Sequence, residues 1–318
     1  MQHVAIVGAG ISGLSCAQTL ERAGIKVSLF DKGRGPGGRM ASRRVETAIG
    51  PAVFDFGAQY FTVRDSAFAE QVHDWEALGL VKQWPIPRPD AYVGVPAMNT
   101  VLRHIASTKD VTFSALVKGL KRHGNRWQLM GEGLGDTWYD GVVLALPAEQ
   151  TAPILTLHDF ELAQAALFAR SQPCWTGMFA FAERLNHASG VIRDSGLIAW
   201  ATRNNAKPGR SGPESWVVQA TPRWSLQHIE FTTDQVGPLL FNALAEEIGA
   251  QLPEPIGQSI HRWRYALSAG TGASCLWNPM LRVGACGDWL IGPRVECAWL
   301  SGRRLAERMV AAASIAAE

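Results

Sequence analysis

The hydrophobic positions at the start of the chain follow a strand pattern, then a helix pattern, then a strand pattern again. Residues 3–7 form a short apolar run, and residues 11–23 carry apolar side chains at helical spacing. Gly24 is placed to end that helix, and residues 26–30 form a second apolar run. This order predicts a β-α-β unit of a parallel sheet, with the right-handed crossover that such units adopt.

The middle and the end of the chain predict further elements in a different order. Short alternating strands come first, a mixture of helices and strands follows, and one strand and one helix close the chain. The expected strands are residues 116–120, 126–130, 142–146, 177–181, 215–220 and 282–286, and the expected helices are residues 160–169, 237–248 and 295–313. Since the last strand and helix fit the first sheet, the segment before them is predicted to be an insertion.

Composition favours a globular protein that binds small molecules. The 318 residues are 47% hydrophobic and carry a net charge of +2, too little to attract nucleic acid or an anionic membrane. The five cysteines are scattered in apolar runs, as reduced buried thiols are, and predict no disulfide framework and no metal site. Without a signal-like start or an apolar stretch of about 20 residues, we expect a cytoplasmic protein with no membrane partner.

A glycine-rich turn joins the first strand to the first helix. Its sequence, GAGISG at residues 8–13, has the three glycines of a dinucleotide fingerprint in the strand-turn-helix setting that the fingerprint requires. Gly8 permits the tight turn, Gly10 lets a pyrophosphate approach the backbone, and Gly13 lets helix and strand pack closely. The amide groups at the start of the helix, around Ser12, are expected to face the phosphates.

The second strand ends in a carboxylate and a cationic loop. Asp31 stands where the fingerprint needs a group that binds a ribose hydroxyl. The loop KGRGPGGRM at residues 32–40 has no role in a plain NAD-binding unit, and its Gly-Gly-Arg resembles the second signature of the flavin-containing amine oxidase superfamily. The resemblance implies that Arg39 helps hold the pyrophosphate of FAD, which suits a guanidinium fork. Lys32 and Gly38 of the same loop are expected to contact FAD as well.

A narrower resemblance follows in the run DFGAQYFT at residues 55–62. It is similar to the segment of renalase and its bacterial relatives that passes beside the isoalloxazine ring. The resemblance implies that Gly57 lets the backbone approach the ring. It also implies that Ala58, Gln59 and Tyr60 contact the flavin, and Tyr60 the substrate too. The alternative is an ordinary buried strand.

Two further segments complete the expected cofactor site by resemblance. Val117 matches the strand position whose backbone faces the adenine. Gly287 and Asp288 resemble the closing motif of the superfamily, in which the aspartate contacts the ribityl or phosphate region. Val295 and Glu296 then start a helix under the flavin pyrimidine. The start of a helix there would stabilise the negative charge that reduction places near the flavin N1 atom.

The resemblance covers nearly the whole chain and sets the expected domains. The predicted fold class is α/β, a Rossmann-type FAD-binding domain with an inserted α+β substrate domain. The FAD-binding domain is expected at residues 1–65, 97–150 and 272–318, and the substrate domain at residues 66–96 and 151–271. FAD is expected to be non-covalent, since no cysteine has the setting of a thioether link.

Two features that serve amine oxidation in this superfamily are missing from the sequence. Many amine oxidases hold a water beside flavin N5 with a lysine, but the only lysine after Lys121 is Lys207, whose loop-like surroundings predict that it is exposed. The tyrosine that commonly forms one wall of an aromatic cage is replaced by Arg294. An arginine would repel a protonated amine and suits a phosphate-bearing substrate.

A strand-like run, HRWRYA at residues 261–266, resembles the strand that brings aromatic and cationic residues to the substrate pocket. Alternation places His261, Trp263 and Tyr265 on one face and the two arginines between them on the other. Either the aromatic face points to the pocket, or Trp263 and Tyr265 belong to the core and the arginines are solvated.

These features favour an FAD-dependent oxidase of 2- or 6-dihydro isomers of NAD(P), with NAD(P) and hydrogen peroxide as products and oxygen as acceptor, as in renalase-like enzymes. A dihydropyridine already donates hydride, so no strong general base is required and no catalytic residue is predicted. An amine oxidase of the same superfamily and a non-catalytic FAD-binding module stay open as alternatives. Neither composition nor motifs indicate an oligomeric state.

Overall fold

The computed structural model describes residues 1–249 and 251–315. Contacts divide the chain into two compact units. Unit 1 consists of Met1–Gly38, Leu102–Ser171 and the segment that begins at Ser268, and unit 2 consists of Arg39–Val101 and Gln172–Leu267. Each unit therefore combines segments that lie far apart in the sequence.

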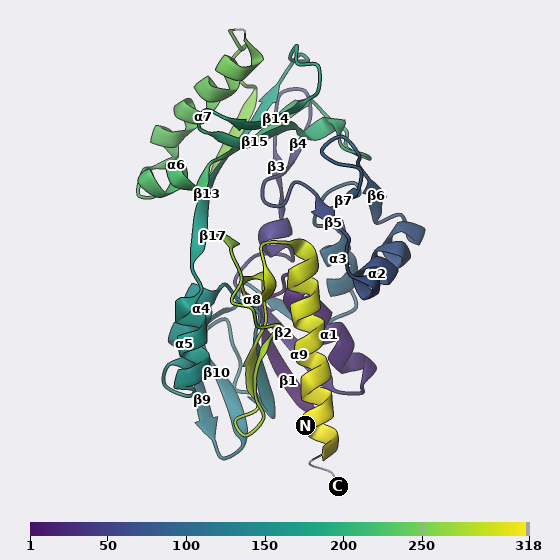
Figure 1. Ribbon diagram of the computed structural model, residues 1–318, viewed down its shortest axis with the longest axis vertical. Coiled ribbons are helices and arrows are strands. Elements are labelled where there is room, and N and C mark those ends of the chain that lie inside the picture. The colour runs from purple at the N-terminus through teal and green to yellow at the C-terminus, as the bar shows by residue number, and fades with distance from the viewer. Residues whose placement is uncertain (250, 316–318) are drawn as a thin grey trace. The chain divides into compact units, whose positions relative to one another are not determined.

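Unit 1 is built on a six-stranded sheet. In spatial order its strands are β18 (Leu276–Asn278), β19 (Val283–Ala285), β12 (Gly141–Leu144), β1 (His3–Val7), β2 (Lys26–Asp31) and β8 (Val111–Phe113). All neighbouring strands run parallel except β18, which pairs antiparallel with β19. Helices α1 (Ile11–Arg22) and α9 (Val295–Ile315) lie side by side in this unit (Figure 1). The expected β-α-β unit is confirmed, and the last strand and helix join the first sheet as predicted.

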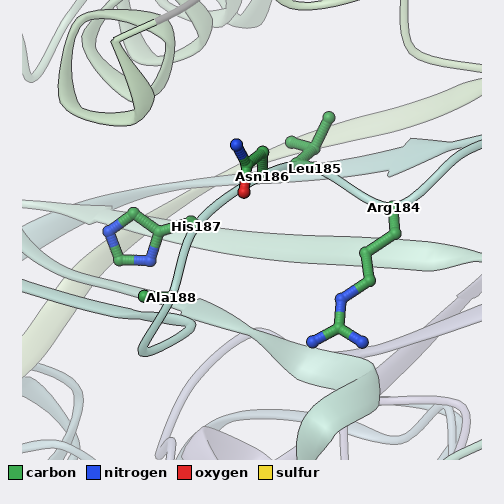
Figure 2. Close-up of a pocket in the computed structure, with 5 residues that line it drawn as sticks. All are labelled: Arg184, Leu185, Asn186, His187 and Ala188. Carbon is green, nitrogen blue, oxygen red and sulfur yellow. The ribbon is translucent and has the colours of Figure 1, made fainter.

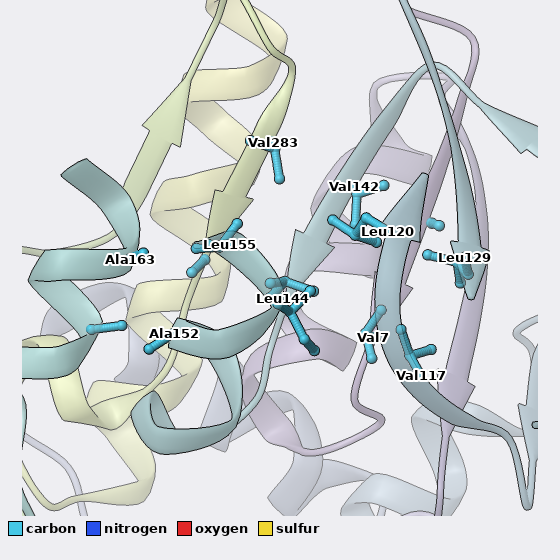
Figure 3. Close-up of a cluster of buried hydrophobic side chains, with 14 of the residues drawn as sticks. Val7, Val117, Leu120, Leu129, Val142, Leu144, Ala152, Leu155, Ala163 and Val283 are labelled. Carbon is cyan, nitrogen blue, oxygen red and sulfur yellow. The ribbon is translucent and has the colours of Figure 1, made fainter. Parts of the chain in front are cut away.

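The core of unit 1 lies between this sheet and a second layer. That layer contains β9 (Leu116–His123), β10 (Arg126–Glu132), β11 (Trp138–Tyr139), α4 (Ala148–Leu155) and α5 (Phe160–Phe168). Figure 3 shows side chains of the sheet, such as Leu144, together with Leu120 of β9 and Leu155 of α4 in one cluster. Leu144 and Leu155 are fully buried, so truncating either one to alanine would cost about 2–5 kcal/mol.

Unit 2 contains a five-stranded sheet with a core on each face. Its strands are, in spatial order, β14 (Val191–Ser195), β15 (Ile198–Arg203), β16 (Glu214–Ala220), β13 (Ser171–Phe181) and β17 (Gly257–Ser268). Trp216 and Val218 of β16 belong to the core that includes α7 (Thr233–Ile248), whereas Val217 belongs to the core that includes β4 (Ala52–Asp55). Because both faces are covered, the middle of β16 is apolar on successive residues, at 216–218, and does not alternate.

The other elements of unit 2 are short. They are β3 (Ser42–Val45), which pairs with β4, the small sheet of β5 (Phe61–Thr62), β7 (Ala91–Gly94) and β6 (Val81–Gln83), and the helices α2 (Ser66–Ala77) and α6 (Pro222–Gln227). Asp65 caps α2 by accepting hydrogen bonds from the amides of Ala67 and Phe68. Helix α3 (Thr100–Ala106) contains the boundary between the units.

The predicted fold class, α/β with a Rossmann-type parallel sheet and an additional sheet domain, is confirmed. The contact boundaries nevertheless differ from the predicted domain boundaries. Residues 39–65 and 97–101 lie in unit 2, because β4 packs against the sheet of that unit. Residues 151–171 lie in unit 1, because α4 and α5 pack into its core. Residues 250 and 316–318, which fall in the predicted domains, are outside the described residues.

Two further features concern the cysteines and the helices of the described residues. All five cysteines are buried and unpaired. None of the described helices is both long enough and apolar enough to cross a bilayer.

Candidate functional site

Two glycines of the fingerprint are required by packing inside unit 1. Gly8 has a φ of +108°, and a Cβ there would lie 2.5 Å from the carbonyl oxygen of Ala145. A Cβ on Gly13 would lie 2.0 Å from the carbonyl oxygen of Gly8. Both distances are shorter than a van der Waals contact, so these glycines let α1 and the β1 turn approach closely.

Gly10 has a different environment, because a Cβ there would meet no described atom within 4 Å. Gly10 is the N-cap of α1, and no side chain caps the helix. The amides of the first turn therefore have no side-chain cap, and the start of a helix stabilises an anion through its amides and its dipole. Gly38 brings the second motif here, since its Cβ would lie 3.6 Å from the Gly10 Cα.

Ser12 adds an unpaired hydroxyl to the same helix start. Its Oγ is buried and has no hydrogen-bond partner among the described residues. Buried hydroxyls normally have a partner, so an orphaned one marks a place for a bound group. The open side of Gly10 and the Ser12 hydroxyl together fit a pyrophosphate.

Asp31 holds the loops around this helix start. Its Oδ2 accepts a hydrogen bond of 2.7 Å from the Ala9 amide, and its Oδ1 accepts one of 2.7 Å from the Gly33 amide. Each carboxylate oxygen can accept a further bond, so the contact with a ribose hydroxyl stays compatible with this role. Lys32, the next residue, is exposed.

The closing segment adds two buried carboxylates to unit 1. Asp288 begins α8 (Asp288–Ile291), and Glu296 lies in the first turn of α9. Their exposures are 6% and 1%. Arg294 Nη1 lies 2.9 Å from Glu296 Oε2, and the Arg294 side chain is 34% exposed. Arg294 is therefore ion-paired within the chain through a buried nitrogen, Nη1, while part of its side chain is exposed.

Val117 and Gly287 also lie in unit 1. Val117 is 7% exposed and packs in the core, as Figure 3 shows. Its side chain therefore faces inward. The Gly287 amide, just before α8, donates a hydrogen bond of 3.0 Å to Ser301 Oγ of α9.

In unit 2, the segment at residues 55–62 packs on Arg39. The Ala58 amide donates a 2.8 Å hydrogen bond to the Arg39 carbonyl, and a Cβ on Gly57 would lie 2.0 Å from the same oxygen. This contact gives a physical reason for Gly57 other than the predicted approach to a ring. The Arg39 guanidinium donates to the carbonyl of Ala266 at 3.2 Å.

The side chain of Gln59 is buried in a hydrogen-bond network. Its Nε2 donates to the Asp55 carbonyl at 2.5 Å and to the Gly57 carbonyl at 3.1 Å. Its Oε1 accepts a bond of 3.0 Å from Lys207 Nζ. The carboxamide is thus committed to holding its own loop, and contact with a ligand is left to the backbone of this segment.

The predicted exposure of Lys207 is wrong: the residue is 2% exposed. Its ammonium lies 3.2 Å from Asp55 Oδ2 and 5.5 Å from the centre of the Trp84 ring. Burial lowers the pKa of Lys207 to about 8, against the opposing effect of Asp55. The loop around Lys207 is rich in turn residues, but the charge of Asp55 stabilises the buried ammonium.

Asp55 is the centre of this network and was not predicted as a site residue. Its carboxylate accepts hydrogen bonds from Ser42 Oγ and the Met98 amide, and pairs with Lys207 and Arg210. Burial alone would raise the pKa of Asp55. The charges of Lys207 and Arg210 lower it by more than burial raises it, so the pKa is about 2. The only signal in the sequence was its place at the start of the run at residues 55–62.

Tyr60 belongs to an aromatic group that the sequence did not predict. Its ring lies 5.5 Å from that of Trp200 on β15, and Arg193 stacks over Trp200 at 4.9 Å. The indole nitrogen of Trp200 is buried without a partner among the described residues. These residues offer flat apolar surface with one unused donor.

Strand β17 alternates as predicted. Trp263 stacks on Phe56 with ring centres 5.0 Å apart, and His261 meets both rings edge-on. The intervening Arg262 and Arg264 interact instead with Glu230, at 3.7 Å and 2.9 Å. Trp263 and His261 thus pack against β4, and Tyr265 is half-buried further along the strand.

His261 is held in its neutral form. Burial and the nearby charge of Arg43 lower its pKa to about 4. Arg43 Nη2 lies 3.4 Å from His261 Nδ1, and its guanidinium lies over the Phe56 ring. His261 is therefore a polar but uncharged member of this aromatic group at neutral pH.

Two surface concavities, one in each unit, lie apart from the residues described above. One of about 320 Å³ is lined by residues 184–188 of unit 2, and Figure 2 shows the Arg184 and His187 side chains extending in different directions. Another, of about 300 Å³, is lined by residues of unit 1 that include His3 and Tyr139. Neither contains a residue predicted to bind cofactor or substrate.

Comparison with known proteins defines the class of the fold. Residues 6–74 match a family model described as an NAD(P)-binding Rossmann-like domain. Over 98% of its length, the chain has the fold of several solved oxidases. At identities of 12–14%, this likeness shows the shared fold alone.

Three of these structures each share 99% of their own chain with this protein. A chain named "Putative protoporphyrinogen oxidase", from Exiguobacterium sp. 255-15, has a TM-score of 0.75 at 14% identity. Putrescine oxidase bound to putrescine has a TM-score of 0.71 at 14% identity. Cyclohexylamine oxidase from Brevibacterium oxydans IH-35A has a TM-score of 0.72 at 12% identity.

A sequence relative matches a shorter stretch. The Arabidopsis thaliana protein FLOWERING LOCUS D is 41% identical over 59 residues, which are 19% of this chain and 8% of that protein. The chain therefore spans a small part of the length of this curated relative.

Proposed function

We propose that this protein is an FAD-dependent oxidase that converts 2- or 6-dihydro isomers of NAD(P) to NAD(P) and reduces oxygen to hydrogen peroxide. The cofactor assignment is carried by the open helix start at Gly10, with the orphaned Ser12 hydroxyl beside it. The substrate assignment rests on the resemblance of residues 55–62 to renalase. The shared fold with solved oxidases supports the cofactor assignment.

The residues of unit 1 suit FAD. Bound FAD would supply the redox chemistry, by accepting a hydride from the substrate and giving two electrons to oxygen. The amides at the start of α1 and the Ser12 hydroxyl would hold the pyrophosphate, and Asp31 would bind the ribose. Asp31 is already fixed by two backbone amides, so it would meet the ribose without reorganising.

The residues of unit 2 suit a flat, weakly polar ring. Tyr60, Trp200 and Trp263 provide aromatic surface, and the neutral His261 adds no charge that would oppose an oxidised nicotinamide. A dihydropyridine needs to be stacked, shielded from water and held in register, since it is itself the hydride donor. Aromatic side chains fixed by packing perform that task.

Arg294 would bind a phosphate of the substrate. Its guanidinium has five N–H donors, and its Nη1 is ion-paired with Glu296 at 2.9 Å without a hydrogen-bond partner among the described residues. The side chain is partly exposed, so a phosphate can approach the rest of the fork. The same charge disfavours a protonated amine.

Amine oxidation is the main alternative, and the structure alters one argument against it. Lys207 is buried beside Gln59, so the expectation of an exposed lysine no longer counts against that reaction. However, the Lys207 ammonium is already bonded to Asp55 and Gln59. The replacement of a cage tyrosine by Arg294 remains as the argument from residues. A non-catalytic FAD-binding module would show no rapid reduction by any small substrate.

The proposal is tested by anaerobic stopped-flow reduction of the purified flavoprotein. Dihydro isomers of NAD(P) should bleach the flavin rapidly, and normal NADH and primary amines slowly or not at all. The variant Arg294→Leu should raise the half-saturating concentration about 10- to 100-fold, as expected for losing one charge-assisted bond of about 1.5–3 kcal/mol.

Arg303→Leu is the matched control, because Arg303 lies on α9, the helix that Arg294 directly precedes, and pairs with Glu307 at 2.8 Å. It should behave like the wild type. Rapid bleaching by a primary amine, with no response to either dihydro isomer, would contradict the proposal and assign the protein to amine oxidation.

A further inference from the structure

We propose that Lys207 is a positioning residue, which acts through the Gln59 carboxamide to hold the loop at residues 57–60 in place. The functional meaning of that loop rests on the function proposed above, in which it lies beside the flavin. The positioning itself depends only on contacts within unit 2.

The first step is the direction of the Gln59 carboxamide. A carboxamide has an oxygen end and a nitrogen end of nearly the same shape, and an ammonium can only donate hydrogen bonds. Lys207 Nζ therefore selects the Oε1 end, which it meets at 3.0 Å. That choice turns Nε2 toward the carbonyls of Asp55 and Gly57, both of which it reaches. Those two carbonyls can only accept, so they favour the same direction, and Lys207 fixes the opposite end of the carboxamide.

The second step is that Lys207 is not needed to neutralise Asp55. Arg210 already pairs with the same carboxylate oxygen, and Asp55 also accepts bonds from Ser42 and the Met98 amide. A second buried cation leaves the cluster with a net charge of +1, which burial makes unfavourable. Besides its place over the Trp84 ring, Lys207 makes a hydrogen bond to Gln59 that Arg210 is not shown to make, and that bond gives a reason for its presence.

The third step connects Gln59 to the loop. The Gly57 carbonyl accepts from Gln59 Nε2 at 3.1 Å and from Gln219 Nε2 of β16 at 2.8 Å. The Gly57 backbone lies so close to the Arg39 carbonyl that a Cβ on Gly57 would be 2.0 Å from its oxygen. The position of Gly57 therefore depends on two amide groups, and Lys207 orients one of them. Ala58 to Tyr60 follow directly along the backbone.

The proton on Lys207 strengthens this arrangement. A neutral amine can still donate to Gln59 Oε1, but the bond loses its charge assistance and becomes weaker. The charged groups that face Lys207 are Asp55 of β4 and Arg210, and with burial they bring its pKa to about 8. The loop should thus loosen as the pH rises through about 8.

Hydrogen–deuterium exchange of the full-length flavoprotein tests the inference without relying on activity. Lys207→Met should increase exchange at residues 57–60 at least about 10-fold, after correction for intrinsic rates, with little change in β13. Gln59→Met should have the same effect, and the double variant should add nothing, because both changes remove one interaction. In wild type the exchange should rise near pH 8, and Lys207→Met should abolish that rise.

Arg203→Met is the matched control, because Arg203 forms another buried ion pair of unit 2, with Glu214 at 2.8 Å. It should leave exchange at residues 57–60 near the wild-type value. If Lys207→Met does not fold, Gln59→Glu replaces it, since this change keeps an acceptor for Lys207 and removes both donors. It should loosen the same residues.

A kinetic measurement separates positioning from plain stability. Lys207→Met should lower the limiting rate of flavin reduction about 10- to 100-fold, as a misplacement of about 1 Å does, with the half-saturating concentration changed less. Unchanged exchange at residues 57–60, or an equal increase throughout unit 2, would overturn the inference. If exchange responds as expected but no dihydronicotinamide reduces the flavin, the inference stands and the proposed function fails.

Discussion

The substitution Gly10→Ala tests whether the open helix start is a ligand site. Gly10 has φ −78° and ψ 176°, an extended conformation that alanine adopts without strain. Its new methyl group would meet no described atom of the protein within 4 Å. Any effect on cofactor binding must therefore come from contact between the methyl group and the cofactor.

The magnitudes of the two effects can be separated. Alanine restricts the unfolded chain, which stabilises by about 0.4–1 kcal/mol, and it is a poorer N-cap than glycine, which costs a similar amount. The free energy of unfolding without cofactor should thus change by less than about 1 kcal/mol. If the methyl group removes one or two bonds to the pyrophosphate, binding weakens by about 2–4 kcal/mol, or about 30- to 700-fold in Kd.

The assay is titration of the cofactor-free protein with FAD, combined with urea unfolding of the same samples. Gly13→Ala is the opposite case, because its Cβ would lie 2.0 Å from the Gly8 carbonyl. It should destabilise the protein itself by about 1–3 kcal/mol or more. Gly135→Ala is the neutral control, since Gly135 is exposed and its Cβ meets no described atom within 4 Å. An unchanged FAD affinity in Gly10→Ala would refute the assignment of the pyrophosphate to this helix start.

Three further predictions concern charged groups. In equilibrium dialysis, Arg39→Ala should lose more FAD than Lys32→Ala, because an ammonium cannot replace a bidentate fork; equal losses would place Arg39 away from the pyrophosphate. Lys207 has a pKa of about 8 in the folded protein against a usual 10.5, so the unfolded chain binds more protons than the folded protein between these pH values. The free energy of unfolding from urea titration should therefore rise with pH in this range by up to about 3 kcal/mol. This rise should be absent in Lys207→Met. His261 has a pKa of about 4 in the folded protein against a usual 6.5, so its contribution to stability should fall as the pH drops from 6.5 to 4. The midpoint temperatures of thermal unfolding of wild type and His261→Asn should therefore approach each other over this pH range. Parallel pH curves would contradict each of the last two predictions.

The parts of the fold that were predicted depend on local sequence. The glycine turn, the helix after it and the strands on either side follow from residues close together in the chain, and the structure places β1 and α1 where the pattern predicts them. Helix α4 is absent from the predicted elements. It carries Pro153 in its interior, which interrupts the expected pattern.

Lys207 shows why the rest of the candidate site could not be predicted. Its neighbours in sequence are turn residues, which favour exposure, but its counter-ion Asp55 lies 152 residues away. The same holds for Gly57, whose close contact is with the Arg39 backbone. Likewise, the alternation of β17 was predicted, whereas Phe56 as the partner of Trp263 was not. Contacts between distant segments decide which polar residues are buried, and a single sequence does not display them.

The most direct test of the proposed function is an anaerobic titration of the flavoprotein with a 6-dihydro isomer of NAD, followed by absorbance and product analysis. The proposal predicts that one equivalent of NAD forms for each flavin reduced, and that readmitted oxygen restores the oxidised spectrum with one equivalent of hydrogen peroxide. A flavin that stays oxidised in the presence of 2- and 6-dihydro isomers of NAD(P), yet is bleached by a primary amine, would contradict it.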